Sequence, residues 1–395
     1  MDEEAEPMKG RNAAPSDQKI KVAMIIQAYS PKVGGAERQL ASLAPLLRDQ
    51  GIDVQIYTRR YPGLSPYQEM EGVPIIRLPI PGPKPAASLA FSLSALPHLA
   101  RYRPDIIHAH ELLSPTTTAL LAKRIWGVPV LAKILRGGTL GDLAVLDKKP
   151  LGKLRWTLQQ KHVNYFLVIT REIDRELEAS GIPAERRFFL PNGVDTEHFT
   201  PAAAREKTRL KQELGIAEGP CGIYVGRLSP EKRVDLLLDT WPLVRSRQPR
   251  ATLLILGDGP QKKALETAAP PGVRFPGQVR DVAPYLQAAD VFLLPSQTEG
   301  LSNALLEAMA SGLAVIVTSV GGAADLITHQ ENGWLIPADD GENLTEAVRE
   351  LFRQQGLRQK MGRAARETIT SGYALPLIAD RLVGLYRQVA AARED

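Results

Sequence analysis

Cysteine is nearly absent from this sequence, with Cys221 as the only one in 395 residues. A single cysteine excludes an internal disulfide and fits a reducing compartment, so we expect a cytoplasmic protein. Long apolar runs are also missing, since none approaches the roughly 18 residues that a membrane-spanning helix needs. The N-terminal segment is polar and acidic and lacks the apolar centre of a signal peptide, so we predict a disordered tail over residues 1–19.

Metal-binding patterns are missing as well. One cysteine and six scattered histidines give no ligand spacing, and no Asp-x-Asp pair is present to hold a divalent ion beside a diphosphate. We therefore expect neither a metal nor a cofactor. The net charge of +5 is modest and permits anionic substrates or anionic lipid surfaces. No arginine-rich pattern with interleaved aromatic residues indicates nucleic-acid binding, so we expect no nucleic-acid partner.

Strand and helix patterns alternate along the rest of the chain. Several strand candidates are apolar throughout, which is typical of a parallel sheet covered by helices on both faces. The alternation predicts an α/β protein with two doubly wound, Rossmann-like domains. The strand candidates are residues 21–29, 53–59, 73–80, 104–110, 128–135, 165–170, 186–192, 221–227, 252–259, 272–279, 291–296, 313–320 and 333–339.

The boundary between the two domains is predicted shortly after the turn at Asn192-Gly193. The segment that follows contains a proline and a polar run, which is typical of a linker. The last helical pattern has no strand after it, so we expect it to pack back on the first domain. The predicted parts are a first domain over 20–195, a linker over 196–208, a second domain over 209–375 and a last helix over 376–395.

The segment EGLSNALLEAMASG carries two carboxylates, Glu299 and Glu307, eight residues apart. It predicts a loop ending near Ser302 or Asn303 and then a short helix closed by Gly312. Glu299 would precede the free N–H groups of a helix N-terminus, and Glu307 would lie in an apolar helix, where a carboxylate needs hydrogen-bond donors. A polyhydroxylated anion such as a sugar nucleotide would suit both carboxylates and the free amides. The alternative is a solvent-facing Glu307 and a Glu299 that only caps the helix.

Ligands of doubly wound sheets bind beyond the carboxyl ends of the strands, and several loops there contain suggestive residues. Gly34 and Gly35 would let the backbone approach a ligand at a helix N-terminus, or form a plain turn. Asp258, in LGDGP, either lies near the ligand or caps the next helix. The strand end at Val279 and Arg280 would offer backbone groups to a nucleotide base, although an ordinary connection has the same pattern.

The segment GRLSPEKRVDLLLD predicts a helix with Ser229 as N-cap and Pro230 as the first helical residue. Lys232 and Arg233 then fall in the first turn, where cations oppose the helix dipole. A bound diphosphate would reverse that effect, and Arg227 at the strand end would join as a second donor. The alternative is an exposed lysine, and Arg233 is the weaker candidate of the two.

Five motifs occur in order along the chain, namely GGAERQL, PNGVD, YVGRLSPEK, LGDGP and PSQTEGLSNALLEAMASG. Together they resemble the family 4 retaining glycosyltransferases of the GT-B fold. The resemblance covers nearly the whole chain after residue 20 and is most specific over residues 191–325. It implies transfer of a sugar from a UDP-, GDP- or ADP-sugar to a hydroxyl of a glycan, a lipid-linked sugar or a small molecule, without a metal ion.

The resemblance also implies a role for individual residues. Glu307 would bind the ribose hydroxyls of the donor, and Glu299 the hydroxyls of the transferred sugar. Arg227 and Lys232 would stabilise the leaving diphosphate, and Gly35 would approach the phosphate from the first domain. The remaining donor-binding candidates are Gly34, Asn192, Asp258, Val279, Arg280 and the amides of Gly300, Leu301, Ser302 and Asn303.

The chain departs from the family pattern on the acceptor side. Many relatives carry a histidine near the reacting sugar after the strand that matches VPVLAKIL, but here that strand is followed by Leu135-Arg136-Gly137-Gly138. Arg136 would contact acceptor or phosphate, with a surface arginine as the alternative. His110 ends the preceding strand and is expected at the ligand-facing rim as a catalytic candidate, with a structural histidine as the alternative.

Two further interpretations stay open. Because the histidine is missing, a catalytically weak sugar-nucleotide-binding subunit is an alternative. A GT-B-fold epimerase is a further alternative. The basic, partly amphipathic stretch over residues 148–162, which contains Trp156, would rest on an anionic membrane and meet a lipid-linked acceptor. A solvated helix face is the alternative for that stretch.

Overall fold

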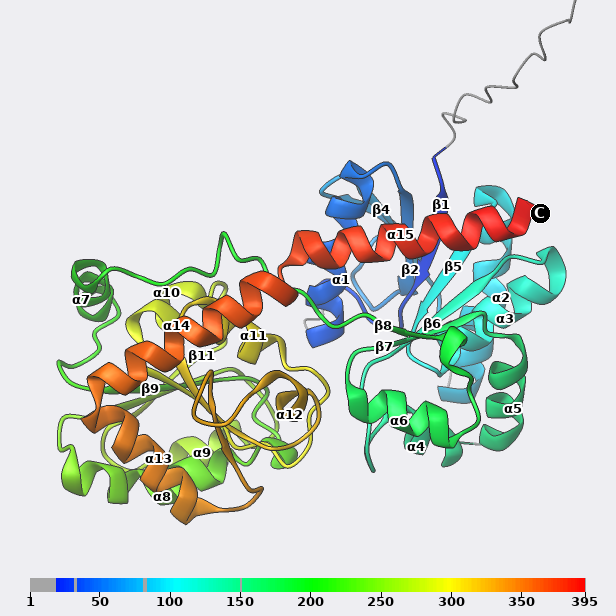
Figure 1. Ribbon diagram of the computed structural model, residues 1–395. Helices are drawn as coiled ribbons and strands as arrows, with labels where there is room; N and C mark the ends of the chain where they lie inside the picture. The colour runs from blue at the N-terminus through cyan, green and yellow to red at the C-terminus, as the bar shows by residue number, and fades with distance from the viewer. Residues whose placement is uncertain (1–18, 32–33, 81–83, 150, 395) are drawn as a thin grey trace, which may run out of the picture.

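The computed structural model describes residues 19–31, 34–80, 84–149 and 151–394. Two lobes lie side by side, each with a central sheet between layers of helices (Figure 1). An eight-stranded sheet forms the centre of the first lobe and a six-stranded sheet the centre of the second. The prediction of two doubly wound, Rossmann-like domains is confirmed. The predicted tail lies outside the described residues, apart from Lys19.

The first sheet has the strand order β3-β4-β2-β1-β5-β6-β7-β8, and all neighbours are parallel except β3 and β4. Alternate residues of β1 face opposite helical layers, with Val22 and Met24 on one side and Ala23 and Ile25 on the other. The strands are β1 (Lys21–Ile25), β2 (Asp53–Arg59), β3 (Tyr67–Met70), β4 (Val73–Leu78), β5 (Ile106–His110), β6 (Val130–Ile134), β7 (Tyr165–Val168) and β8 (Arg187–Phe189).

The second sheet is parallel throughout, with the order β11-β10-β9-β12-β13-β14. Its central strands are buried along their whole length, as the apolar runs predicted. The strands are β9 (Cys221–Val225), β10 (Thr252–Leu256), β11 (Val273–Gly277), β12 (Val291–Leu294), β13 (Ala314–Thr318) and β14 (Trp334–Ile336).

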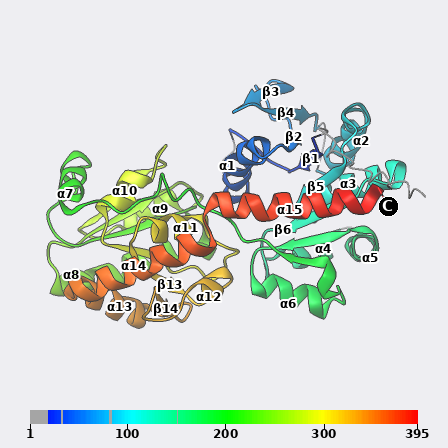
Figure 2. The ribbon, with the colours of Figure 1, turned by 45° about the horizontal axis from the view of Figure 1, so that its top comes forward.

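Helices connect these strands and cover both faces of each sheet (Figures 1 and 2). Among the described residues, no helix is both long and apolar enough to span a membrane. The helices are α1 (Gly35–Asp49), α2 (Lys84–Tyr102), α3 (Ser114–Trp126), α4 (Asp142–Asp147), α5 (Gly152–His162), α6 (Arg171–Ala179), η1 (Ala184–Arg186), α7 (Ala204–Glu213), η2 (Pro230–Lys232), α8 (Val234–Arg247), α9 (Lys262–Ala268), α10 (Ala283–Ala288), α11 (Asn303–Ala310), α12 (Gly322–Leu326), α13 (Gly341–Arg353), α14 (Gln355–Gly372) and α15 (Leu375–Glu394).

The last helix, α15, leaves the second lobe and lies along the first, as Figure 2 shows. Its Ile378, Leu382 and Tyr386 are buried in the same apolar cluster as Met24 and Leu131 of the first sheet. The helix therefore completes the core of the first lobe, and the prediction that it crosses back is confirmed.

The chain passes between the lobes twice, near Val194 and near Tyr373, and these two segments are joined by backbone hydrogen bonds. The N–H of Val194 donates to the carbonyl of Tyr373, and the N–H of Leu375 donates to the carbonyl of Val194, both at 2.9 Å. The predicted linker follows the first crossing, but it extends too far along the chain, because α7 begins at Ala204. Its alanine- and charge-rich end is helical rather than extended.

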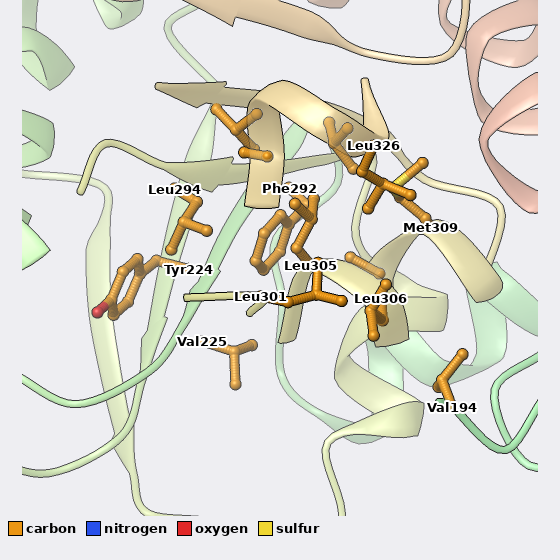
Figure 3. Packing of buried hydrophobic residues seen from close by; sticks show 14 of the residues in the cluster. Val194, Tyr224, Val225, Phe292, Leu294, Leu301, Leu305, Leu306, Met309 and Leu326 are labelled. Atoms are coloured by element: carbon orange, nitrogen blue, oxygen red, sulfur yellow. The ribbon is translucent and has the colours of Figure 1, made fainter. Parts of the chain in front are cut away.

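Helix α11 lies in the second lobe, where its apolar side chains enter the core. Leu305, Leu306 and Met309 are buried and belong to one cluster with Phe292 of β12 (Figure 3). The helix begins at the N-cap Ser302, whose hydroxyl accepts from the N–H of Leu305 at 3.3 Å. This packing fixes the direction in which the helix N-terminus points.

Candidate functional site

The carboxyl ends of both sheets meet between the lobes, and a pocket of about 460 Å³ lies there. Residues of α1 in the first lobe form one wall, and the segments around Val279 and α11 form the other. Several predicted donor-binding residues line it together, namely Val279, Arg280, Asn303 and Glu307. The pocket therefore brings together residues from segments that lie far apart in the sequence.

Glu307 is buried in the wall of this pocket. Its side chain is 8% exposed, and its Oε2 atom has no hydrogen-bond partner among the described residues. Burial raises the pKa of this carboxyl from 4.5 to about 7, and the charges of Arg38 and His198 lower it in part. A carboxyl that lines a pocket and has an unpaired oxygen is suited to accept a hydrogen bond from a ligand hydroxyl.

Glu299 lies just before α11 and is paired with a lysine. Its Oε1 atom accepts from Nζ of Lys232 at 2.5 Å and from the hydroxyl of Ser296 at 2.8 Å. The side chains of Lys232 and Glu299 are only 17% and 10% exposed. Two motifs that lie 67 residues apart in the sequence thus place a cation and a carboxylate in direct contact.

The segment around Lys232 does not form the continuous helix predicted from Ser229 and Pro230 onward. Residues Pro230–Lys232 form a 3₁₀ turn, and Arg233 adopts a left-handed conformation (φ 50°) before α8 begins at Val234. Ser229 does not cap a helix; its hydroxyl donates to the carboxylate of Glu231 at 2.7 Å. The break separates the two cations, because Arg233 pairs with Asp235 at 3.1 Å while Lys232 pairs with Glu299.

The loop that enters α11 presents its backbone to the cleft. A Cβ atom at Gly300 would lie 2.3 Å from the carbonyl oxygen of Leu135, so only glycine fits this close approach of the lobes. The hydrogen bonds found among the described residues do not include the N–H groups of residues 300–303. Free amides at a helix N-terminus are suited to bind an anion.

A chain of hydrogen bonds joins this loop to the first lobe. The Asn303 amide donates to the carbonyl of Gly35 at 2.8 Å and accepts from the Asn192 amide at 3.0 Å. Asn192 also donates to the carbonyl of Leu301 and accepts from Nζ of Lys133 at 3.1 Å. Asn192 was predicted to bind the donor, but its amide is occupied by protein groups and instead positions the start of α11.

Other predicted residues lie in exposed positions. Arg227, Asp258 and Arg280 are exposed, and Val279 is half-buried. The carboxylate of Asp258 accepts from the neighbouring N–H of Gly259 at 2.8 Å and stabilises its own turn rather than capping α9. Gly34 is the N-cap of α1, and the carboxylate of Glu37 in the first turn lies against it.

The placement of His110 is a correction. Its imidazole is 3% exposed and stacks on His108 with 4.4 Å between the ring centroids, instead of lying at the ligand-facing rim. Burial holds its pKa well below the usual value, with the neighbouring His108 and Lys133 adding to the effect. The reason is that the whole of β5 is covered on both faces. Arg136 is exposed after β6.

Two acidic residues occupy the rim where His110 was expected. Glu111 follows β5 with a left-handed backbone (φ 82°), and Asp142 accepts from the N–H of Leu135 at 2.8 Å. Burial raises the pKa of Glu111 to about 8 and that of Asp142 to about 6. The sequence pattern does not mark Asp142 as a site residue, because an acidic residue at a helix start is typical of ordinary helix N-termini. The glycines before Asp142 indicate a constrained loop there, and Gly138 and Gly141 do form a hydrogen-bonded turn.

The arrangement has the features needed to hold a sugar nucleotide and to stabilise a leaving diphosphate. It combines a carboxylate with an unpaired oxygen, a lysine–carboxylate pair and free helix N-terminal amides. Within the described ranges, no group of three or more His, Cys, Asp and Glu side chains has a geometry that could hold a metal ion.

Family models match both lobes. The glycosyl transferase 4-like domain matches residues 34–193, and glycosyl transferases group 1 matches residues 219–354. The sulfoquinovosyl transferase SQD2 of Arabidopsis thaliana is 30% identical over 351 residues, which are 85% of this chain and 67% of that protein. A GDP-mannose-dependent alpha-mannosyltransferase of Mycobacterium tuberculosis is 29% identical, with 95% and 98% of the two chains covered.

Solved structures of low sequence identity share the fold. A sucrose-phosphate synthase from Thermosynechococcus elongatus superposes with a TM-score of 0.80 at 21% identity, covering 95% of this chain and all of that one. Anabaena HepE in complex with UDP superposes with a TM-score of 0.79 at 19% identity, covering 93% and 100%. Together with the family matches, these similarities show that the chain belongs to the family 4 glycosyltransferases of the GT-B fold, which transfer a sugar from a nucleotide-diphosphate sugar to an acceptor.

Proposed function

We propose that this protein is a retaining, metal-independent hexosyltransferase whose donor half-site is formed by Glu299, Lys232, Glu307 and the amides before α11. The observation that carries the proposal is the contact between Lys232 and Glu299 directly before a helix N-terminus whose amides are free. A cation is needed where diphosphate charge develops, and a carboxylate is needed where sugar hydroxyls donate.

In the proposed reaction, the bond between the anomeric carbon and the diphosphate oxygen breaks through an oxocarbenium-like state. The acceptor oxygen then bonds to the same face of that carbon, and its proton passes to the departing phosphate oxygen. Lys232, Arg227 and the amides of residues 300–303 stabilise the charge that grows on the diphosphate. Glu299 accepts hydrogen bonds from the transferred sugar and holds the Lys232 ammonium in place.

A thermal-shift screen of UDP-, GDP- and ADP-sugars tests the proposal. One donor class should raise the melting temperature, because a ligand that binds only the folded state stabilises it by mass action. That donor should then be turned over with a chelator present, and the product should keep the anomeric configuration of the donor. If no nucleotide sugar stabilises the protein, or if the product is inverted, the proposed function is wrong.

The affinity for a nucleotide sugar is expected to rise as the pH increases from about 6 to about 8. Glu307 has its pKa raised to about 7 by burial, so the carboxyl changes from mostly neutral to mostly ionised over this range. Ribose hydroxyls donate more strongly to the ionised form. Calorimetric titration at several pH values should show the trend in the wild type and a nearly flat profile in Glu307→Gln.

The same carboxyl should also make the stability of the ligand-free protein depend on pH. This dependence runs opposite to that of donor affinity, because stability falls as the pH rises. Because its folded pKa lies above the ordinary value of 4.5, the neutral form favours the ligand-free fold. This contribution is full below about pH 4.5 and is lost as the pH rises through about 7.

A Glu307→Gln variant with an unchanged pH profile of donor affinity would show that another group controls binding.

We also propose that the protein docks on anionic membranes, which would bring it to a lipid-linked acceptor. Leu151, Leu154 and Leu158, at α5, are 71%, 54% and 43% exposed. Leu121 and Ile125 of the neighbouring α3 are 38% and 56% exposed, and both helices line one pocket of about 550 Å³. The exposed basic residues beside them are Arg124, Lys148, Lys149, Lys153 and Lys161. Exposed leucines flanked by lysines and arginines suit an anionic lipid surface.

Vesicle sedimentation tests this docking. The protein should sediment with vesicles that contain anionic phospholipid, and about 0.5 M salt should release most of it. Leu154→Glu should reduce the bound fraction several-fold. Leu243→Glu, at an equally exposed leucine of α8, is the matched control and should bind like the wild type. Binding that does not depend on anionic lipid, or equal losses in both variants, would contradict the proposal.

A further inference from the structure

Gln39 of α1 is a second buried polar residue that lines the pocket between the lobes and carries an atom without a partner. Its side chain is 5% exposed, and its Nε2 atom has no hydrogen-bond partner among the described residues. Gln39 and Glu307 line the same pocket of about 460 Å³ from opposite lobes. Buried donors and acceptors are nearly always paired, so two residues that line one pocket and each carry an orphaned atom point to a ligand that satisfies both.

The position of Gln39 indicates which part of the ligand it meets. Gly35, at the first residue of α1, lies next to Asn303 at the entry of α11, where the diphosphate is expected. Gln39 is one helical turn further on, about 6 Å along the axis. The pocket around it is lined by His198, Val279 and Glu307 but not by Lys232 or Glu299, so it is the nucleoside end of the donor site.

The chemistry of the two groups is complementary. A carboxylate such as Glu307 only accepts hydrogen bonds, whereas Nε2 of a glutamine amide only donates. A ribose with its base presents hydroxyl donors as well as ether, hydroxyl and carbonyl acceptors. A nucleoside therefore supplies partners for both orphaned atoms at once, whereas a fully ionised inorganic anion has no donor for Glu307.

We propose that Gln39 is a nucleoside-binding residue that donates a hydrogen bond from Nε2 to an oxygen of the donor's ribose or base, opposite the Glu307 carboxylate. This inference rests on the proposed function, because it assigns one more contact to the same donor. The first lobe then takes part in binding the nucleoside as well as the acceptor. Donor binding bridges α1 and α11, and so links the two lobes before the sugar is transferred.

Gln39→Met tests the assignment, because methionine keeps the length of the side chain and removes the amide. Titration calorimetry with UDP, GDP and ADP should show dissociation constants about three- to tenfold higher for the preferred nucleotide. The dissociation constant of inorganic pyrophosphate should stay unchanged. The melting temperature without ligand should be equal or higher, since an unpaired buried amide is removed.

Gln159→Met is the matched control. Gln159 is also buried in the first lobe, but its Nε2 donates to the carbonyl of Leu112 at 2.7 Å. This variant should melt at a lower temperature and bind nucleotides like the wild type. Gln39→Glu, which keeps the shape and reverses the hydrogen bond, should weaken nucleotide binding more than Gln39→Met, because it places a second carboxylate at the pocket.

Three outcomes would overturn the inference. Gln39→Met that binds nucleotides as tightly as the wild type removes the proposed contact. An equal loss for pyrophosphate places Gln39 at the phosphates instead of the nucleoside. If the wild type binds pyrophosphate but none of the three nucleotides, the proposed function itself is wrong. The proposed role of Gln39 is then also wrong.

Discussion

Glu299→Gln is expected to lower the turnover number by about a hundredfold or more while the fold stays intact. The amide still accepts from Ser296 through its oxygen, but it cannot hold the Lys232 ammonium with a full negative charge. The sugar also loses a charged acceptor for its hydroxyls. The change is measured as kcat with a matched donor and acceptor, beside the melting temperature of the free protein.

Glutamine is a sharper substitution than alanine at this position. Removing the whole side chain would leave the nearly buried Lys232 unpaired, and breaking a buried ion pair costs about 3–5 kcal/mol. An alanine variant would thus mix lost catalysis with lost stability. Glu231→Gln is the matched control, since its carboxylate accepts from Ser229 instead of Lys232. Unchanged turnover in Glu299→Gln, or an equal loss in the control, would contradict the assignment.

Lys232→Met is expected to lower kcat by about a hundred- to a thousandfold. The methionine keeps the apolar part of the side chain but removes the cation that meets the departing diphosphate. Affinity for the nucleoside diphosphate product should also fall, while affinity for the nucleoside alone should not. Single-turnover kinetics with saturating donor separate the chemical step from binding.

The neighbouring cation supplies the control for this prediction. Arg233 follows Lys232 directly, but it faces Asp235 and Asp339. Arg233→Met should therefore retain most of its turnover. The double variant Glu299→Gln with Lys232→Met should lose much less than the product of the two single losses, because the two groups act as a unit. Losses that multiply would show that the contact between them has no part in catalysis.

The donor half-site was the most predictable part of the molecule. The bounds of α11 follow from local signals, because Ser302 caps the helix and Gly312 ends it with a positive φ of 72°. The burial of Glu307 also follows from its apolar neighbours in the helix. Such features depend on residues within a few positions of each other, so the sequence alone carries them.

Features that depend on contacts between distant segments could not be predicted. Nothing in the sequence near Gln39 shows that its amide lies opposite α11, because that wall belongs to the other lobe. His110 looked like a rim residue because strand ends usually reach the surface, yet β6 and Tyr386 of α15 enclose the pair His108–His110. The helix predicted at Ser229 fails for the same reason, since Lys232 turns toward Glu299.

The path of α15 has a consequence for how the chain is made. The ribosome releases the first sheet early and the last helix late, but Ile378, Leu382 and Val389 cover one face of that sheet. Until α15 emerges, this face of the first lobe exposes apolar side chains such as Met24 and Leu131. The hydroxyl of Tyr386 also lies 2.7 Å from Nδ1 of His108, so α15 supplies a polar contact to the first sheet as well. The nascent enzyme is therefore a candidate client of chaperones throughout synthesis of its second lobe, and a stop codon just before residue 375 would leave two lobes of which only the second has its full core.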